Sequence, residues 1–407
     1  MKGLRGRSLV AVVCLAQVLA QVGAFSWPAL MPMLAPRWEL SNSAAGWITG
    51  IFYLAYALAV PILVTMTDRV DPRRIYLFGV GCTVASHALF AAYAEGFWSA
   101  LALRALAGIG WAGTYMTGVK LLADQVDAKL MSRAVSGHAA SIGISGALSF
   151  AWAGLLTAAW GWEASFAMSA AMAVLAWGMV AVLVPAARPR HAAIGKLFDF
   201  RPVLANRAAM AYAVAYGFHT LEMNALRGWG VAFLGFVLAG AGASEAVAGP
   251  ALVMTGIALA GTLVSVGGNE VAMRFGRRRL IAVAIVSAAI LGALLGFVGP
   301  ASYGLAIALM TLYGLAIWID SASLTAGAAG AADPARRGAT LAIHSMLGYL
   351  GGFVGPLLIG FVLDLAGGPS AMSWGLAFTA IGALGLAALV AFHRLGPGVV
   401  PGDKPSP

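Results

Sequence analysis

Charged side chains are scarce in this chain of 407 residues. Asp, Glu, Lys and Arg together make up 10% of it, whereas 61% is hydrophobic. A soluble domain carries about 25% charged residues, so this composition excludes an ordinary soluble domain. The high hydrophobicity also excludes a disordered chain. The two cysteines, Cys14 and Cys82, lie in apolar runs and predict neither a disulfide framework nor a metal site.

Signatures of enzymes and cofactor sites are also missing. The sequence contains no His-Glu-x-x-His, no Walker loop and no Gly-x-Ser-x-Gly. We therefore expect no enzyme, no cofactor and no bound metal. Because no ATP-binding motif is present, any uphill transport must draw on a gradient of an ion or a solute.

Long apolar stretches fill most of the chain. Each is long enough to cross a bilayer, which takes about 20 residues. The first stretch follows a basic start and resembles a secretory signal, but we favour a retained helix because the apolar run continues beyond Trp27. The pattern predicts an all-α polytopic membrane protein with twelve transmembrane helices at 8–30, 44–66, 74–94, 98–121, 134–158, 163–184, 207–228, 247–268, 279–299, 302–325, 339–362 and 371–393.

Basic residues are sorted between the predicted loops. Of the 25, 21 lie in segments on one side, and only Arg37 and Arg227 lie on the other. The positive-inside rule places the basic segments in the cytoplasm. We therefore expect a multi-pass protein of the cytoplasmic (inner) membrane with both termini inside. The net charge of +10 is then loop charge, so nucleic acid is not expected as a partner.

The two halves of the chain repeat each other. The segment 185–206 reads as a cytoplasmic linker between six-helix bundles at 1–184 and 207–394, with a short cytoplasmic tail at 395–407. An offset of 206 residues aligns His138 with His344 and Thr114 with Asp320. The basic loops align at an offset of 205, which places Arg73 on Arg278. The pattern indicates a duplicated unit.

Several motifs carry a family resemblance. The loop after the second span reads Asp68-Arg69-Val70-Asp71-Pro72-Arg73-Arg74, and its counterpart reads Arg274-Phe275-Gly276-Arg277-Arg278, with Met273 where an acid is expected. Span four begins Arg104-Ala105-Leu106-Ala107-Gly108-Ile109-Gly110. Together with the twelve spans and the duplication, these motifs resemble the major facilitator superfamily (MFS).

The resemblance implies two pseudo-symmetric six-helix bundles around a central cavity lined by spans one, four, seven and ten, with alternating access. A charged loop at a helix end can also bias such a two-state change by a few kcal/mol. The alternative is a solvated basic loop. We expect the conformational-switch loops to comprise Asp68, Arg69, Arg73, Arg74, Arg274, Arg277 and Arg278.

Ionisable residues inside the spans are candidates for function because they are costly in a bilayer. Asp320, two thirds of the way along span ten, is the main candidate for proton exchange. The alternative is a structural acid paired with Lys120 or His344. Lys120 is expected to snorkel to the interface, and His138 and His344 are expected to begin their spans as interfacial residues.

Arg104 and Glu222 are interpreted as opposite charges at the outer ends of spans four and seven, which could form a gate or hold a charged substrate. Snorkelling of both is the alternative. His219, one turn before Glu222, could complete a proton relay or be a packing residue. Further candidates for contact with substrate are Gln17, Gln21 and Trp318.

We interpret the chain as a secondary transporter that moves a small organic solute by alternating access. Proton coupling, as symport or antiport, is expected, and so is a functional monomer in the lipid bilayer. The first alternative is a multidrug-type efflux antiporter. The second is a non-transporting membrane sensor on the same fold.

Overall fold

The computed structural model describes residues 4–67, 69–186, 200–241, 248–398, 400 and 403, and within them it contains helices and no strands. The chain divides into two compact units, Met1–Leu30 with Ile51–Leu197 and Met31–Gly50 with Phe198–Pro407. In the described part, eleven helical stretches are long and apolar enough to cross a membrane. This confirms the predicted all-α membrane fold and nearly matches the predicted twelve spans. The remaining predicted span, 98–121, is split into two shorter helices.

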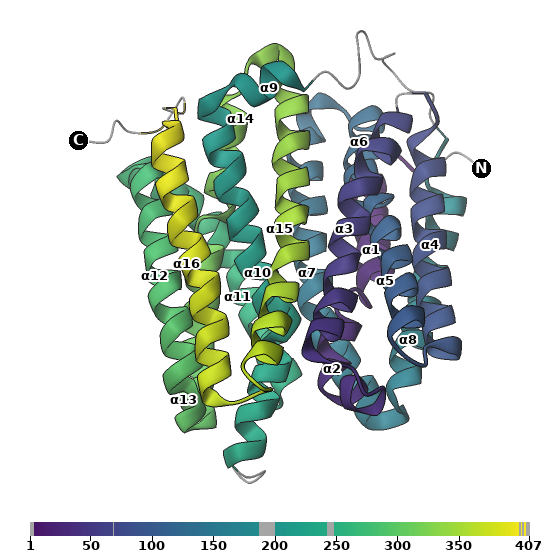
Figure 1. Ribbon diagram of the computed structural model, residues 1–407. Helices are drawn as coiled ribbons and strands as arrows, with labels where there is room; N and C mark the ends of the chain where they lie inside the picture. Colours follow the sequence, from purple (N-terminus) through teal and green to yellow (C-terminus); the bar gives the residue numbers. More distant parts are fainter. Residues whose placement is uncertain are drawn as a thin grey trace. The chain divides into compact units, whose positions relative to one another are not determined.

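Unit 1 is built around helix α4. This helix packs against α8 and α5, and α1 packs against α8 and α7. The core between these helices, whose arrangement Figure 1 shows, includes Leu9, Val13, Tyr76, Leu121 and Val180, each almost fully buried. Its helices are α1 (Gly6–Gln21), α2 (Ser26–Arg37), α3 (Asn42–Met66), α4 (Pro72–Tyr93), α5 (Phe97–Ala112), α6 (Tyr115–Gln125), α7 (Ala128–Trp160) and α8 (Trp162–Leu183). The end of α2 and the start of α3 belong to unit 2.

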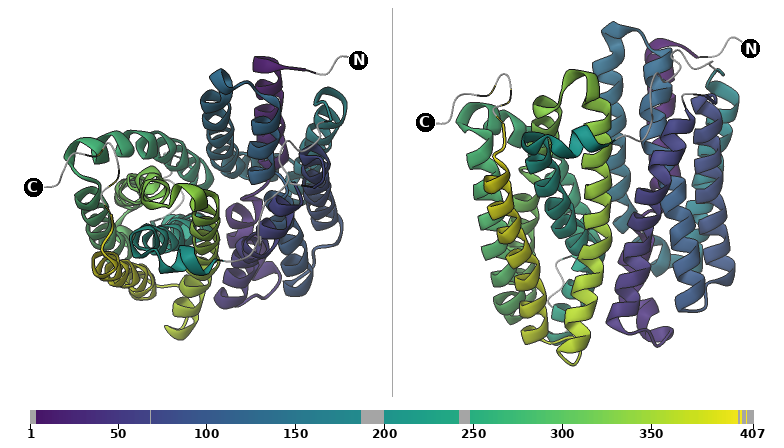
Figure 2. Two further views of the ribbon diagram at one scale, coloured as in Figure 1. Left: turned by 90° about the horizontal axis from the view of Figure 1, so that it is seen from above. Right: turned by 45° about the horizontal axis from the view of Figure 1, so that its top comes forward.

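Unit 2 is built around helix α10, which packs against α15, α16 and α14, while α12 packs along α16. Figure 2 shows these helices running roughly parallel to one another. The helices of unit 2 after residue 198 are α9 (Arg201–Ala205), α10 (Arg207–Ala241), α11 (Pro250–Phe275), α12 (Arg277–Val298), α13 (Tyr303–Trp318), α14 (Ser321–Ala331), α15 (Arg337–Leu365) and α16 (Ala371–Leu395), with short 3₁₀ turns η2 (Gly299–Ala301) and η3 (Pro334–Arg336).

Small residues bring α10 and α15 into close contact. A Cβ on Gly351 would meet the carbonyl oxygen of Gly217, and a Cβ on Gly355 would meet that of Leu221. Membrane helices gain no hydrophobic free energy from packing in lipid, so glycine stripes that let backbones approach are a main source of their association. The close approach places the polar residues of α10 next to those of α15.

Local chemistry sets the helix starts. The Asp71 carboxylate accepts a hydrogen bond from the backbone N–H of Arg73 at 2.9 Å, and Pro72 occupies the first position of α4. Both features are typical of helix N-termini. In the second repeat, Gly276 alone separates α11 from α12 at φ 99°, a conformation that only glycine adopts without strain.

Three predicted spans are interrupted. The first breaks at 22–25 between α1 and α2, the fourth at Gly113–Thr114, and the tenth at Ile319–Asp320. Thr114 and Asp320 are the residues that the repeat aligns, so the two breaks fall at equivalent places. Discontinuous helices expose backbone polar groups at the depth where transporters bind solutes and ions.

The structure corrects the predicted end of span seven. Helix α10 continues to Ala241 instead of ending near residue 228. Arg227 therefore lies within the helix and not in an outside loop, and Glu222 lies near the helix middle and not at its outer end. The apolar residues resume at Trp229, which lets the helix continue beyond Arg227 and Gly228.

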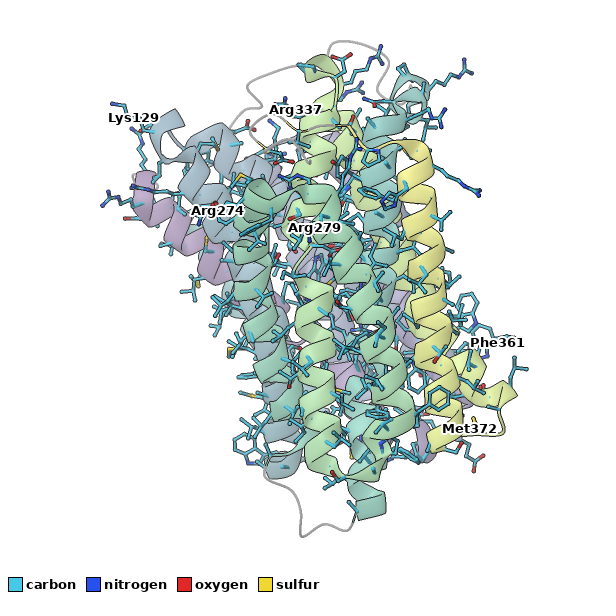
Figure 3. The ribbon with its side chains drawn as sticks, turned by 90° about the vertical axis from the view of Figure 1, so that its left-hand side faces the viewer. Lys129, Arg274, Arg279, Arg337, Phe361 and Met372 are labelled. Carbon is cyan, nitrogen blue, oxygen red and sulfur yellow. The ribbon has the colours of Figure 1, made fainter. Side chains whose placement is uncertain are left out.

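Most arginines of unit 2 gather at one end, and Arg227 within α10 is an exception. Figure 3 shows Arg274, Arg279 and Arg337 near that end, and Phe361 and Met372 toward the opposite one. We call this end of unit 2, with the start of α12 and the ends of α11, α14 and α16, the basic end. The segregation agrees with the sorting of basic residues read from the sequence.

Candidate functional site

Asp320 lies at the break in span ten, directly before α14, and faces His219 of α10. The imidazole Nδ1 and the carboxylate Oδ1 are 2.8 Å apart, and the side chains are 2% and 4% exposed. The sequence reading had offered Lys120 and His344 as partners of Asp320, but the structure provides His219. A buried ion pair of this kind is costly to desolvate and is weak evidence for stability alone.

The two atoms lie within ion-pair distance without an aligned hydrogen bond. Within the described residues, neither Asp320 Oδ1 nor His219 Nε2 has a hydrogen-bond partner in good geometry. The contact is therefore electrostatic, and it is attractive only when Nδ1 carries a proton. Buried polar atoms that lack partners usually have a reason in function or in bound water.

An aromatic ring links His219 to a second histidine. Tyr216, one turn earlier on α10, stacks on His219 with ring centroids 5.7 Å apart and on His344 of α15 at 3.9 Å. His344 Nε2 also lies 3.2 Å from the hydroxyl oxygen of Thr325 in α14. His344 is buried about two turns inside α15, so it does not begin its helix as predicted.

Glu222 lies one turn beyond His219. The hydroxyl of Tyr313, in α13, donates to Glu222 Oε1 at 3.0 Å. A small cavity, with room for about one water molecule, is lined by His219, Glu222 and Asp320 together with apolar residues of α12, α13 and α16. The cavity thus joins two carboxyl groups and one imidazole, which is an arrangement that can pass a proton.

Trp318, the last residue of α13, is part of the same region. The guanidinium of Arg227 lies over its ring, 4.7 Å from the centroid. A Cβ on Gly261 of α11 would meet the indole atoms, so the glycine makes room for this ring. Trp318 therefore holds the end of the broken helix, and its predicted contact with substrate stays a prediction.

Unit 1 has its own polar cluster at the breaks in spans one and four. Gln17 accepts a hydrogen bond from the Tyr76 hydroxyl at 3.1 Å, and the Gln21 amide donates to the Thr114 hydroxyl at 3.0 Å. The backbone N–H of Phe25 donates to Ser149 at 2.8 Å. Side chains from other helices therefore satisfy the backbone that the first break exposes, as a membrane interior requires.

Arg104 is a buried cation beside the same break. It is 1% exposed, its Nη1 donates to the carbonyl oxygen of Ala24 at 2.9 Å, and its guanidinium lies 4.5 Å from the centroid of the Phe52 ring. Its Nε and Nη2 have no hydrogen-bond partner among the described residues. A gate between Arg104 and Glu222 stays a prediction.

Lys120 belongs to a local pair. Its ammonium lies 2.7 Å from the carboxylate of Asp124, one turn later on α6, and the two side chains are 23% and 7% exposed. Pairs spaced four residues apart on a helix are common and stabilise it modestly. Lys120 therefore pairs within α6, and the ionisable partner of Asp320 is His219.

The switch-loop arginines bind helix ends. Arg73 donates to the carbonyl oxygens of Val180 and Ala181 at the end of α8. Its repeat equivalent, Arg278, donates to the carbonyl oxygen of Pro397, just after α16. A cation at a helix C-terminus stabilises the helix dipole. Arg69, Arg74 and Arg274 are exposed, and Asp68 lies outside the described residues.

The comparisons with known proteins agree with this architecture. The sequence model of the Major Facilitator Superfamily matches residues 13–249, more than half of the chain. The chain belongs to the major facilitator superfamily. It is therefore a multi-pass membrane transporter rather than an enzyme, as the sequence predicted.

Individual relatives of this MFS protein are distant. An uncharacterized MFS-type transporter of Bacillus subtilis (strain 168), YwoD, is 31% identical over 90 residues, which span 22% of this chain and only 20% of that relative. A crystallised mutant of the nucleoside transporter NupG is 14% identical and matches with a TM-score of 0.78, covering 95% of this chain and 100% of its own. A POT family transporter in complex with 5-aminolevulinic acid is 11% identical with a TM-score of 0.76, covering 95% of each chain. At these identities the solved structures establish the fold alone.

The sequence reading missed two members of the unit 2 site. Tyr313 lies seven residues before Asp320, on the same face of span ten, and this spacing could have singled it out. Thr325 carried no comparable signal because its partner, His344, is on another helix. Both residues belong to span ten, which contains the break, and each contacts an ionisable side chain of another helix. Tyr313 contacts Glu222, and Thr325 contacts His344.

Proposed function

We propose that the protein is a proton-coupled secondary transporter that moves a small organic solute by alternating access. The observation that carries the proposal is the buried contact between His219 and Asp320 at the break in span ten. An ionisable pair inside a membrane span is by default a functional candidate. Its position at a discontinuous helix favours a role in coupling.

Protonation changes what the pair does. A proton on the Asp320 carboxylate removes the attraction to His219, and loss of that proton restores it. The pair can therefore bias two arrangements of α13 and α14 by its charge state, and a bias of a few kcal/mol is enough to shift the populations of two conformations.

The surroundings suit a proton path. Glu222 lies on the same cavity and can relay a proton to or from Asp320 through about one water molecule. The ring of Tyr216 stacks on His219, and the hydroxyl of Tyr313 donates to Glu222. The Tyr313 hydroxyl can orient Glu222 without carrying charge.

Unit 1 supports an acidic group on the solute. Arg104 holds a charge within the membrane part of the unit and has two donor nitrogens without partners in the described part of the chain. A guanidinium with free donors binds carboxylate or phosphate groups well. The printed names of the structural relatives suggest nucleosides and 5-aminolevulinic acid as first members of a test panel.

The test is transport by purified protein in proteoliposomes that contain a pH-sensitive dye. Nucleosides, 5-aminolevulinic acid and simple carboxylates are added in turn, with and without an imposed pH gradient. We expect at least one solute to move with a matching proton flux. Proton flux in the direction of the solute indicates symport. Proton flux in the opposite direction indicates antiport, as expected of an efflux antiporter. Solute movement that is indifferent to the pH gradient would contradict proton coupling.

We further propose a functional monomer in the cytoplasmic membrane, with both termini inside. The sorting of basic residues supports this orientation. It can be tested by replacing Cys14 and Cys82 with serine and labelling single cysteines introduced at exposed positions such as Arg279 and Met372, which lie toward opposite ends of unit 2. We expect a membrane-impermeant thiol reagent applied to intact cells to label only the cysteine at position 372.

A further inference from the structure

Arg277, the first residue of α12, is a buried hub at the basic end of unit 2. Its Nε and Nη2 bind the two carboxylate oxygens of Asp403 at 2.9 and 2.8 Å. Its Nη1 donates to Asn269 Oδ1 at 2.9 Å and to the carbonyl oxygen of Ser323 at 2.8 Å. The side chains of Arg277 and Asp403 are only 4% and 8% exposed. The guanidinium thus ties together α11, α14 and the segment after α16.

The segment after α16 is held at several points. Beyond Gly396, the carbonyl oxygen of Pro397 accepts from Arg278, and that of Gly398 accepts from the Tyr212 hydroxyl at 3.0 Å. Val400 is 7% exposed and packs where a Cβ on Gly330 of α14 would lie. These contacts place Pro397, Gly398 and Val400 against α12, α10 and α14, at the end of unit 2 where Asp403 meets Arg277.

The ion pair belongs to unit 2 alone. The repeat aligns Arg277 with Pro72, which cannot bind a carboxylate. The loop before Arg277 carries Met273 at the position where its counterpart has an acid. A cation at the first position of a helix also opposes the helix dipole, so Arg277 needs a nearby anion. Within the described residues, Asp403 is the carboxylate that pairs with it.

We propose that Asp403 is a positioning residue that holds α14 through Arg277 and so controls the movement of the inner half of span ten. The carbonyl that Arg277 binds belongs to Ser323, three residues after Asp320, so the tether acts on the helix that begins at the proposed proton site. The role in transport rests on the proposed function, whereas the tether itself does not. The segment after α16 is thereby part of the transport machinery.

The first test is hydrogen–deuterium exchange of the full-length protein. Asp403→Asn removes the charge but keeps the size of the side chain. We expect α14 to exchange about tenfold faster in this variant, since charge-assisted hydrogen bonds that restrain its opening are lost. Helix α6, the equivalent of α14 in unit 1, is the internal control. Unchanged exchange in α14, or an equal rise in α6, would overturn the tether.

Two further variants separate the ion pair from general folding. Asp403→Glu retains the carboxylate and should return exchange in α14 close to that of the unmodified protein. Arg279→Gln removes an exposed arginine two residues along the same helix and should leave α14 unchanged. A failure of Asp403→Glu to restore protection would contradict the proposal, as would an effect of Arg279→Gln equal to that of Asp403→Asn.

The transport readout uses a panel solute that the unmodified protein carries, normalised to folded protein. We expect Asp403→Asn to lower the maximal rate about fivefold and to leave KM unchanged, because the proposed tether acts on the movement of α14 and not on solute binding. An unchanged maximal rate together with faster exchange in α14 would overturn the role in transport. If the unmodified protein shows no proton-coupled transport, the proposed function fails, and the exchange comparison still decides the tether.

Discussion

Removal of His219 alone should destabilise the protein far more than removal of both partners of the buried pair. His219→Gln leaves the Asp320 carboxylate buried at 4% exposure without the imidazole that faces it. Breaking a buried ion pair in this way costs about 3–5 kcal/mol. For a cooperative unit of about 200 residues, this corresponds to a fall in Tm of roughly 6–20 °C.

The double-mutant cycle supplies the decisive comparison. Asp320→Asn leaves a neutral imidazole and should cost about 1 kcal/mol, and the double variant should be more stable than His219→Gln alone. We expect a coupling of at least about 2 kcal/mol between the two positions. Thermal melting of the four proteins in one detergent measures it.

The matched control is His344→Gln. This buried histidine makes a neutral contact with Thr325 at 3.2 Å, so its loss should cost only about 1 kcal/mol. Additive effects of His219→Gln and Asp320→Asn, with no measurable coupling, would refute the assignment of an energetically significant pair.

Two further predictions concern the neighbours of the site. Tyr313→Phe removes the donor to Glu222 and should lower stability by about 1–3 kcal/mol, measured by thermal melting, because a buried oxygen loses its partner; an unchanged Tm would contradict this. Gly268→Ala places a Cβ against the carbonyl oxygen of Ile319 and should destabilise by about 1–3 kcal/mol, whereas Gly267→Ala, which meets open space, should be neutral or slightly stabilising. Equal effects of the two alanines would count against the close packing at the break.

The spans were predictable because a membrane helix has a strong local signature. Runs of about 20 apolar residues predicted eleven of the observed membrane helices, and the main error is the end of span seven, whose helix continues to Ala241. The breaks were not predictable, because a break persists only where distant side chains satisfy its backbone. Arg104 binds Ala24 and Gln21 binds Thr114, and both contacts link different spans.

The candidate site was predictable in its residues but not in its pairing. Asp320 and His219 stood out because ionisable side chains are rare in apolar spans. Their contact joins residues of two helices, and no local pattern connects them. Asp403 gave no signal at all, since an aspartate in a polar tail is ordinary until the fold brings it to Arg277.

Proton-driven accumulation by Asp320→Asn tests the central claim most directly. The solute that the unmodified protein carries is offered to proteoliposomes with and without a pH gradient, and Asp124→Asn serves as a control because Asp124 is a buried acid that pairs with Lys120 on its own helix. The account predicts that Asp320→Asn loses accumulation driven by the pH gradient but still exchanges solute at equilibrium, while Asp124→Asn accumulates normally. Full accumulation by Asp320→Asn would contradict the account.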